Sequence, residues 1–190
     1  MEAINQHVYS LTRYLYLQLL QVKHSSFSNI SLTCRNGRPV VEIYGKHEAN
    51  NKDVQGGILA MNFLRANGSY IGYYEIQTAS AAKNIHIRTG CHCNPGACRK
   101  YLKESEAVLK TLSLEKDSCS DEIDMVNGKP VGAIRVSLGY LTNFNDIMRY
   151  VDFVKSYIDA WTVCFILDNG VQPRLSARPG GLRCARPAPL

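Results

Sequence analysis

The chain has 190 residues, of which 45% are hydrophobic and 20% charged, and its formal net charge is +6. This composition is typical of one globular domain with a hydrophobic core and excludes a chain that is disordered throughout. The apolar runs fall well short of the roughly 20 residues that span a bilayer, so no transmembrane helix is predicted. No basic face interleaved with aromatic residues precedes residue 165, and no nucleic-acid partner is expected.

The cysteines and the amino terminus indicate the compartment. The chain has seven cysteines, an odd number, and three of them are crowded together as Cys91, Cys93 and Cys98. This uneven distribution does not fit the disulfide framework of a small secreted domain. The first residues enter an amphipathic pattern without a basic start, an apolar stretch and a small-residue cleavage site. A reducing, cytoplasmic setting is therefore predicted.

The first half of the chain predicts one long helix and three strands. Apolar residues recur at three- and four-residue steps over residues 4–22, which is typical of one face of a helix. Residues 39–44 have the β-branched alternation of a strand. Residues 57–64 and 70–76 flank Asn67-Gly68, a strong hairpin signal, and are predicted as two antiparallel strands.

The second half predicts further helices and strands around the cysteines. Residues 78–83 are expected to be helical, and 84–88 are expected to form a strand that ends where the cysteines begin. Pro95-Gly96 is expected to stop any regular element, and a helix is predicted over 97–114. Residues 133–138 predict another strand, and Asn143 is a suitable N-cap for a last helix.

Together these elements predict an α+β fold, a small mixed sheet with packed helices. Residues 1–160 are expected to form this domain. From residue 161 the sequence becomes rich in Arg, Pro and Gly and loses its periodicity, so residues 161–190 are predicted to be a poorly ordered tail.

The cysteine-rich stretch is the candidate chemical centre. A thiol acts as a nucleophile or sulfur carrier when it is exposed and readily ionised, and a loop bounded by Gly90 and Gly96 gives such a position. Arg88 and His92 lie nearby in sequence and would favour the thiolate. Cys93 is therefore predicted to be the catalytic residue, carrying sulfur as a persulfide, with His92 assisting it.

Two other readings of these residues remain open. Cys91, His92, Cys93 and Cys98 include thiol and imidazole ligands, so the alternative function is a non-catalytic module that binds a metal or a partner. The spacing lacks two separated Cys-X-X-Cys pairs, and no metal site is predicted. Arg135 lies in an otherwise apolar strand, where its guanidinium would either form a structural ion pair or bind a substrate carboxylate.

Two stretches carry a family resemblance. Residues 88–102 read RTGCHCNPGACRKYL, and residues 127–140 read NGKPVGAIRVSLGY. Both resemble the molybdenum cofactor sulfurase family, and the first also resembles the active-site loop of the wider class V aminotransferase-like cysteine desulfurases. The resemblance extends over about residues 1–158. It implies the carboxyl-terminal small subdomain of the desulfurase unit, as in fold-type I pyridoxal phosphate enzymes.

The resemblance implies a sulfurtransferase. In that family a pyridoxal 5'-phosphate enzyme takes sulfur from L-cysteine, leaves alanine, and delivers the sulfur to the molybdenum cofactor. The implied downstream recipients are molybdenum hydroxylases such as xanthine dehydrogenase and aldehyde oxidase. The resemblance is compatible with a homodimer.

The resemblance also implies roles for single residues. It identifies Cys93 with the persulfide cysteine and Arg135 with the arginine that binds the substrate carboxylate, and Arg88 is a second candidate for that role. The context of Lys23, Lys46, Lys52 and Lys83 does not resemble that of the family's Schiff-base lysine. Residues 26–35 look like an insertion. Because neither the family's Schiff-base lysine nor its pyridoxal-binding and carboxyl-terminal domains are recognised in the sequence, the chain is expected to be a fragment or truncated form.

Overall fold

The computed structural model describes residues 1–24, 37–91, 94–102 and 123–158. They form a mixed α+β domain, as predicted. No helix in this described part is both long enough and apolar enough to cross a membrane.

A four-stranded antiparallel sheet forms the middle of the domain, in the order β1-β2-β6-β3. Its strands are β1 (Val41–Tyr44), β2 (Ile58–Phe63), β6 (Ala133–Ser137) and β3 (Arg88–Gly90). A separate two-stranded ribbon of β4 (Met125–Val126) and β5 (Lys129–Pro130) turns at Asn127-Gly128. A short 3-10 helix, η1 (His47–Ala49), lies between β1 and β2.

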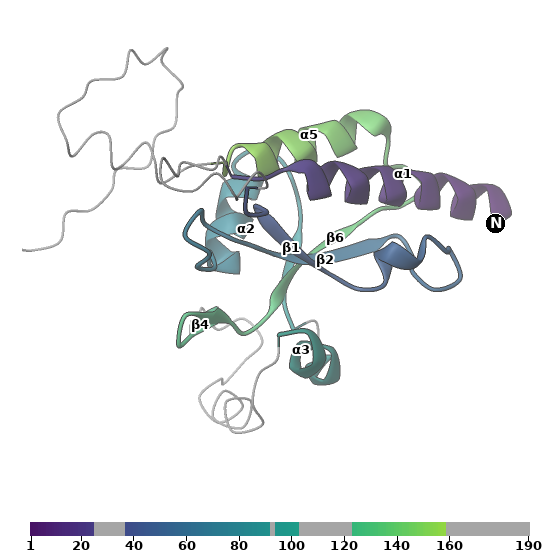
Figure 1. The fold of residues 1–190 in the computed structure, drawn as a ribbon. Helices are drawn as coiled ribbons and strands as arrows, with labels where there is room; N and C mark the ends of the chain where they lie inside the picture. The colour runs from purple at the N-terminus through teal and green to yellow at the C-terminus, as the bar shows by residue number, and fades with distance from the viewer. Residues whose placement is uncertain (25–36, 92–93, 103–122, 159–190) are drawn as a thin grey trace, which may run out of the picture.

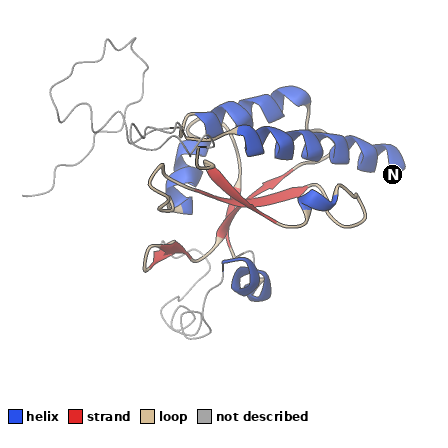
Figure 2. Ribbon diagram, viewed as in Figure 1, coloured by secondary structure: helices blue, strands red, loops and turns tan. Residues whose placement is uncertain are grey.

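Helices cover one face of the sheet. Figures 1 and 2 show α1 (Glu2–Gln21) and α5 (Phe144–Lys155) running side by side above the strands, with α2 (Tyr73–Ala81) at one end. Helix α3 (Pro95–Leu102) lies below the sheet (Figure 1). The side chains beneath α1, α2 and α5 form the hydrophobic core.

Strand alternation divides the sheet into two faces of different chemistry. The helix-covered face carries fully buried apolar side chains, those of Leu59, Met61, Phe63 and Ile134. The opposite face, which we call the polar face, carries Glu42, Tyr44, Asn62, Arg88 and Arg135. The polar face continues into the cysteine stretch, because β3 ends one residue before Cys91.

Most of the predicted elements are confirmed. The helix predicted over 4–22 is α1, and the strands predicted over 39–44, 57–64 and 133–138 are β1, β2 and β6. Asn143 caps α5 through a capping box, since its Oδ1 accepts from the backbone N–H groups of Asn145 and Asp146 while Asp146 accepts from Asn143. The predicted tail, residues 161–190, lies outside the described residues.

The strand predicted over 70–76 is wrong. The Asn67-Gly68 turn is present, with Gly68 at φ 91°, but the returning chain forms only the bridge between Leu64 and Tyr70. The chain then enters α2, because Tyr73, Ile76 and Ser80 recur at helical spacing and are all buried. The stretch 70–76 is too short for its apolar pattern to distinguish the two-residue period of a strand from the 3.6-residue period of a helix.

Two predicted boundaries near the cysteines also differ. The strand predicted over 84–88 is found as β3 but begins later and covers Arg88–Gly90. It begins later because the Asn84 backbone is left-handed and the Ile85 N–H donates to Ser80 O rather than to a neighbouring strand. Pro95-Gly96 does not stop regular structure. Instead α3 begins at Pro95, since proline is favoured in the first turn of a helix. The rest of the helix predicted over 97–114 lies outside the described residues.

Candidate functional site

The cysteine loop joins the end of β3 to α3. Gly90, at φ 103°, ends the strand in a conformation that favours glycine, and Cys91 follows it directly. Asn94 Oδ1 accepts from the Ala97 N–H at 3.1 Å and so caps the first turn of α3. The predicted catalytic Cys93 and its assisting His92 lie outside the described residues. The structure thus describes both ends of the loop.

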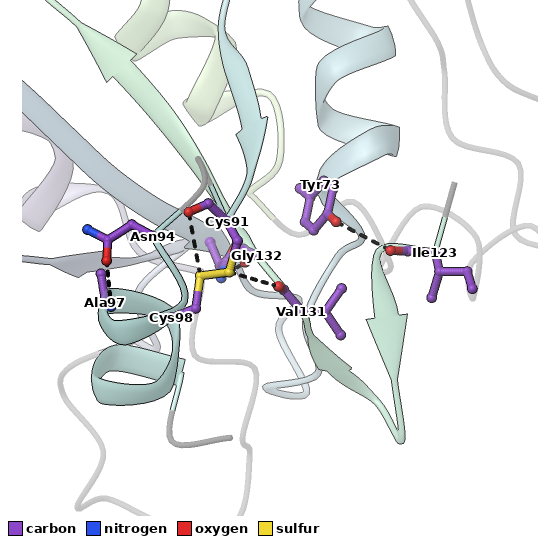
Figure 3. The surroundings of a disulfide bond; sticks show 9 residues. Tyr73, Cys91, Asn94, Ala97, Cys98, Ile123, Val131 and Gly132 are labelled. Carbon is purple, nitrogen blue, oxygen red and sulfur yellow. Dashed lines mark hydrogen bonds between the residues drawn. A yellow bond between two sulfur atoms is a disulfide. The ribbon is translucent and has the colours of Figure 1, made fainter. Parts of the chain in front are cut away.

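A disulfide closes the cysteine loop (Figure 3). It joins Cys91 to Cys98 of α3, whose Cα atoms are 6.0 Å apart. The Cys91 sulfur lies 3.6 Å from Val131 O, and the Cys98 sulfur lies 3.9 Å from Cys91 O. The sequence did not predict this pairing. In reducing compartments disulfides are rare, and those that occur are usually transient or catalytic.

The disulfide bears on the metal-binding alternative. A metal site needs its cysteines as thiolates, and two of the four candidate ligands, Cys91 and Cys98, are bonded to each other here. Within the described ranges, no group of three or more His, Cys, Asp or Glu side chains is arranged to hold a metal ion.

The first end of the loop is packed tightly against the segment that leads into β6. Gly90 pairs with Ala133, and a Cβ placed on Gly132 would lie 2.6 Å from the Gly90 carbonyl carbon. Figure 3 shows Gly132 beside Cys91. Only glycine allows this approach. The position of Gly132 therefore determines where the loop starts.

Two arginines lie side by side on the polar face. Arg135 in β6 is directly opposite Arg88 in β3. Arg135 is half-buried, and its Nε is buried without a hydrogen-bond partner, whereas Arg88 is exposed. The ion pairs of the described chain, Arg65–Glu75 and Lys155–Asp152, include neither residue. Like charges directly opposite each other destabilise a sheet unless an anion lies between them.

This geometry bears on the two interpretations of Arg135. A structural ion pair would need an acidic side chain close to the guanidinium, and the described residues offer none. The unpaired Nε–H and the neighbouring Arg88 instead suit a planar anion such as a carboxylate. Cys91 comes three residues after Arg88, and at about 3.3 Å per strand residue it lies about 10 Å from Arg88 along the strand.

The same face carries a group of polar residues that was not predicted from the sequence. Asn62 is fully buried in β2, where its Nδ2 donates to Gly132 O at 3.0 Å and to Tyr44 Oη at 3.2 Å. Burial raises the pKa of Tyr44. Burial and the hydrogen bond to Glu42 raise the pKa of Tyr70 to about 12. The one available signal was an asparagine between the apolar Met61 and Phe63.

The described lysines do not fit the covalent anchor of pyridoxal phosphate. Such a lysine forms a Schiff base with the cofactor, and its amine is activated by desolvation or by a nearby cation. All lysines in the described ranges are exposed, including Lys23, Lys46, Lys52 and Lys83. Lys83, as an example, donates to Ser156 and lies over the Phe153 ring. No step of the chemistry is therefore assigned to this cofactor on this chain.

A surface cavity elsewhere in the domain does not include the predicted site residues. It measures about 230 Å³ and lies between β6, the amino-terminal half of α5 and residues 84–87. Its lining includes His86, Asp146 and Arg149. Arg149 donates to Lys83 O, and Asp146 is engaged in the α5 capping box. The predicted chemistry lies at the other end of β6.

Comparisons with known proteins give one consistent relationship. No protein-family model matches the chain. Over 157 positions the chain is 40% identical to the molybdenum cofactor sulfurase of Drosophila yakuba. These positions make up 82% of this chain and 19% of that protein. The match to the Bombyx mori molybdenum cofactor sulfurase is 37% over 161 positions. The match to the Homo sapiens molybdenum cofactor sulfurase is 34% over 154 positions. The chain spans only 16% to 19% of the length of these relatives.

Proposed function

Because the chain is homologous to a segment of the molybdenum cofactor sulfurases, we propose that it is the sulfur-carrying small subdomain of such an enzyme. In this proposal sulfur from L-cysteine is held as a persulfide and passed to the molybdenum cofactor. The pyridoxal phosphate chemistry is supplied by another domain or polypeptide, because the described lysines are exposed. The proposed setting is the cytoplasm.

The proposed carrier is Cys93. Its thiol and L-cysteine give the persulfide and alanine, so one C–S bond of the substrate breaks and one S–S bond forms. Transfer to the molybdenum centre breaks that S–S bond and restores the thiol. Two electrons from a thiol reductant convert the transferred sulfur to sulfide, which binds molybdenum in place of an oxygen ligand that leaves as water. A low-pKa, accessible cysteine suits both steps, because the thiolate is the reactive form.

The proposed substrate clamp is Arg135, with Arg88 beside it. The observation that carries the proposal is this arginine pair, which has no acidic partner in the described ranges. Arg88 lies on β3, which leads to the cysteine loop, and Arg135 lies opposite it on β6. A bidentate hydrogen bond from a guanidinium would fix the substrate carboxylate. The substrate's sulfur would then be directed toward the loop.

The test is to trap the persulfide. The full chain is mixed with a pyridoxal phosphate-bearing desulfurase domain and L-cysteine labelled with ³⁵S, alkylated, and digested for mass spectrometry. We expect the label on the peptide that contains Cys93, in a form that a reductant releases. Cys93→Ser is expected to abolish it.

The matched control is Cys119→Ser, which removes a cysteine outside the cluster. It is expected to retain the label at the wild-type level. Label that persists in Cys93→Ser, or that moves to Cys119 in the wild-type chain, would overturn the assignment of the carrier.

A further inference from the structure

The polar face contains a chain of hydrogen bonds that crosses two strands. Tyr70 Oη donates to Glu42 Oε2 at 2.6 Å, and Tyr44 Oη donates to the same oxygen at 3.3 Å. Asn62 Nδ2 donates to Tyr44 Oη at 3.2 Å and to Gly132 O at 3.0 Å. Hydrogen bonds linked in this way polarise one another, so this hydrogen-bond network acts as a unit from the Glu42 carboxylate to the Gly132 carbonyl.

The Gly132 end of this chain reaches the start of the cysteine loop. Gly132 packs directly against the backbone of Gly90, and the preceding Val131 O contacts the Cys91 sulfur. A shift of Gly132 would therefore shift Gly90 and Cys91. Asn62 is the side chain that holds the Gly132 carbonyl in position.

The other end of the loop is also in contact with this chain of hydrogen bonds. The ring of Tyr44 lies against the ring of Tyr101, with centroids 6.1 Å apart. Tyr101 belongs to α3, the helix that also carries Cys98. Tyr44 thus contacts the helix at one end of the loop through Tyr101, and Asn62, hydrogen-bonded to Tyr44, reaches the other end through Gly132.

Stability alone does not explain an amide at this position. Asn62 is 0% exposed, and its Oδ1 is buried without a hydrogen-bond partner. A buried polar atom that is left unpaired opposes folding. The amide therefore has a cost that its bond to Gly132 has to offset.

We propose that Asn62 and Tyr44 are positioning residues that hold both ends of the cysteine loop against the polar face. This inference rests on the proposed function in one respect, namely that the loop carries the sulfur. The anchoring itself depends only on the described contacts. Loss of the anchor would loosen the loop and change the surroundings of Cys93 while leaving the helix-covered core in place.

The test is hydrogen exchange of the full chain, followed by peptide for residues 88–102, 129–137 and 144–158. Asn62→Leu keeps the side-chain size and removes both donors, and is expected to speed exchange of the first two peptides about tenfold, with less than about twofold change in the third. Tyr44→Phe keeps the ring contact with Tyr101 and is expected to give a smaller change in the same two peptides. Tyr44→Phe is also the milder variant if Asn62→Leu does not fold.

Ser80→Ala is the matched control, because it removes a buried hydrogen bond within α2, from Ser80 Oγ to Gln77 O. It is expected to leave exchange of residues 88–102 unchanged. Equal acceleration in all three peptides, or none in residues 88–102, would overturn the proposal.

A second readout follows the chemistry of the loop. The pH dependence of Cys93 alkylation is expected to change in Asn62→Leu and to stay unchanged in Ser80→Ala. A merely structural loss would lower stability without moving this profile, and an unmoved profile therefore counts against positioning. Neither measurement uses L-cysteine or a pyridoxal phosphate domain, so failure of sulfur transfer leaves both results interpretable.

Discussion

The two faces of the sheet use the same strands for different purposes. On the helix-covered face, Leu59, Met61 and Phe63 are fully buried, and every one of them packs into a continuous apolar core. On the polar face, the intervening positions hold Asn62 and Arg135, each with a buried polar atom that lacks a partner. Burial of the helix-covered face stabilises the fold. The polar face instead holds buried polar atoms without partners and two arginines side by side.

This difference indicates where the domain can be changed without loss of its fold. Burial of apolar area is the dominant favourable term in folding, so the helix-covered face sets stability. Unpaired donors, like-charge neighbours and close glycine contacts are unfavourable for stability, and such features concentrate at functional sites. Substitutions on the helix-covered face should therefore lower the free energy of unfolding most, whereas substitutions on the polar face should change it little and affect the site instead.

The largest effect on stability is expected from Phe63→Ala. Phe63 is 0% exposed, and its ring contacts those of Phe153 and Tyr157. Removing it leaves a cavity in the core and is expected to lower the free energy of unfolding by about 3–5 kcal/mol. Denaturant unfolding measures this. Phe144→Ala, at a phenylalanine that is 52% exposed, is the control and is expected to cost less than about 1 kcal/mol. Similar losses at both positions would contradict the contrast.

A smaller, pH-dependent effect is expected from Tyr70→Phe. The pKa of Tyr70 is raised from 10.0 to about 12 by burial and by Glu42. A group whose pKa is raised on folding stabilises the fold fully below its unfolded value, and this contribution is lost as the pH rises through the folded value. The unfolding free energy should therefore fall from about pH 10 to about pH 12, and Tyr70→Phe should reduce that slope by up to about 1 kcal/mol per pH unit after solvent screening.

The measurement for Tyr70 is a series of urea titrations across this pH range. Tyr140→Phe, at a tyrosine that is 66% exposed, is the matched control and should leave the slope as it is. A slope that Tyr70→Phe does not change would show that the Tyr70–Glu42 bond makes no net contribution to the folded state.

The smallest effect on stability is expected from Arg135→Gln. The side chain has no acidic partner in the described ranges and lies opposite Arg88, so its loss should change the free energy of unfolding by less than about 0.5 kcal/mol. In the persulfide assay, however, the L-cysteine concentration for half-maximal labelling should rise about tenfold, because a carboxylate clamp is lost. Arg149→Gln, on α5, is the control and should alter neither quantity. Unchanged half-saturation in Arg135→Gln would remove Arg135 from the substrate site.

The parts of the fold that were predictable have a long or strongly directional signal. Helix α1 covers 20 residues, and a period of 3.6 is unmistakable over that length. The capping box of α5 was visible as Asn143 because capping depends on side chains within one turn. The strand predicted over 70–76 failed because seven residues fit either period, and burial of Tyr73 and Ile76 against the core selected the helix.

The sequence by itself determined the chemical types present. It identified the cysteine stretch, the two arginines Arg88 and Arg135, and their resemblance to a sulfur-transfer family, because residue type and spacing along one segment carry that information. Tertiary structure alone decided which of these meet. Strand register brings Arg88 opposite Arg135, and packing of β2 against β6 brings Asn62 to Gly132 at the start of the cysteine loop. Asn62 and Gly132 are 70 residues apart in sequence, and no local pattern encodes a hydrogen bond between positions that only the folded sheet brings together.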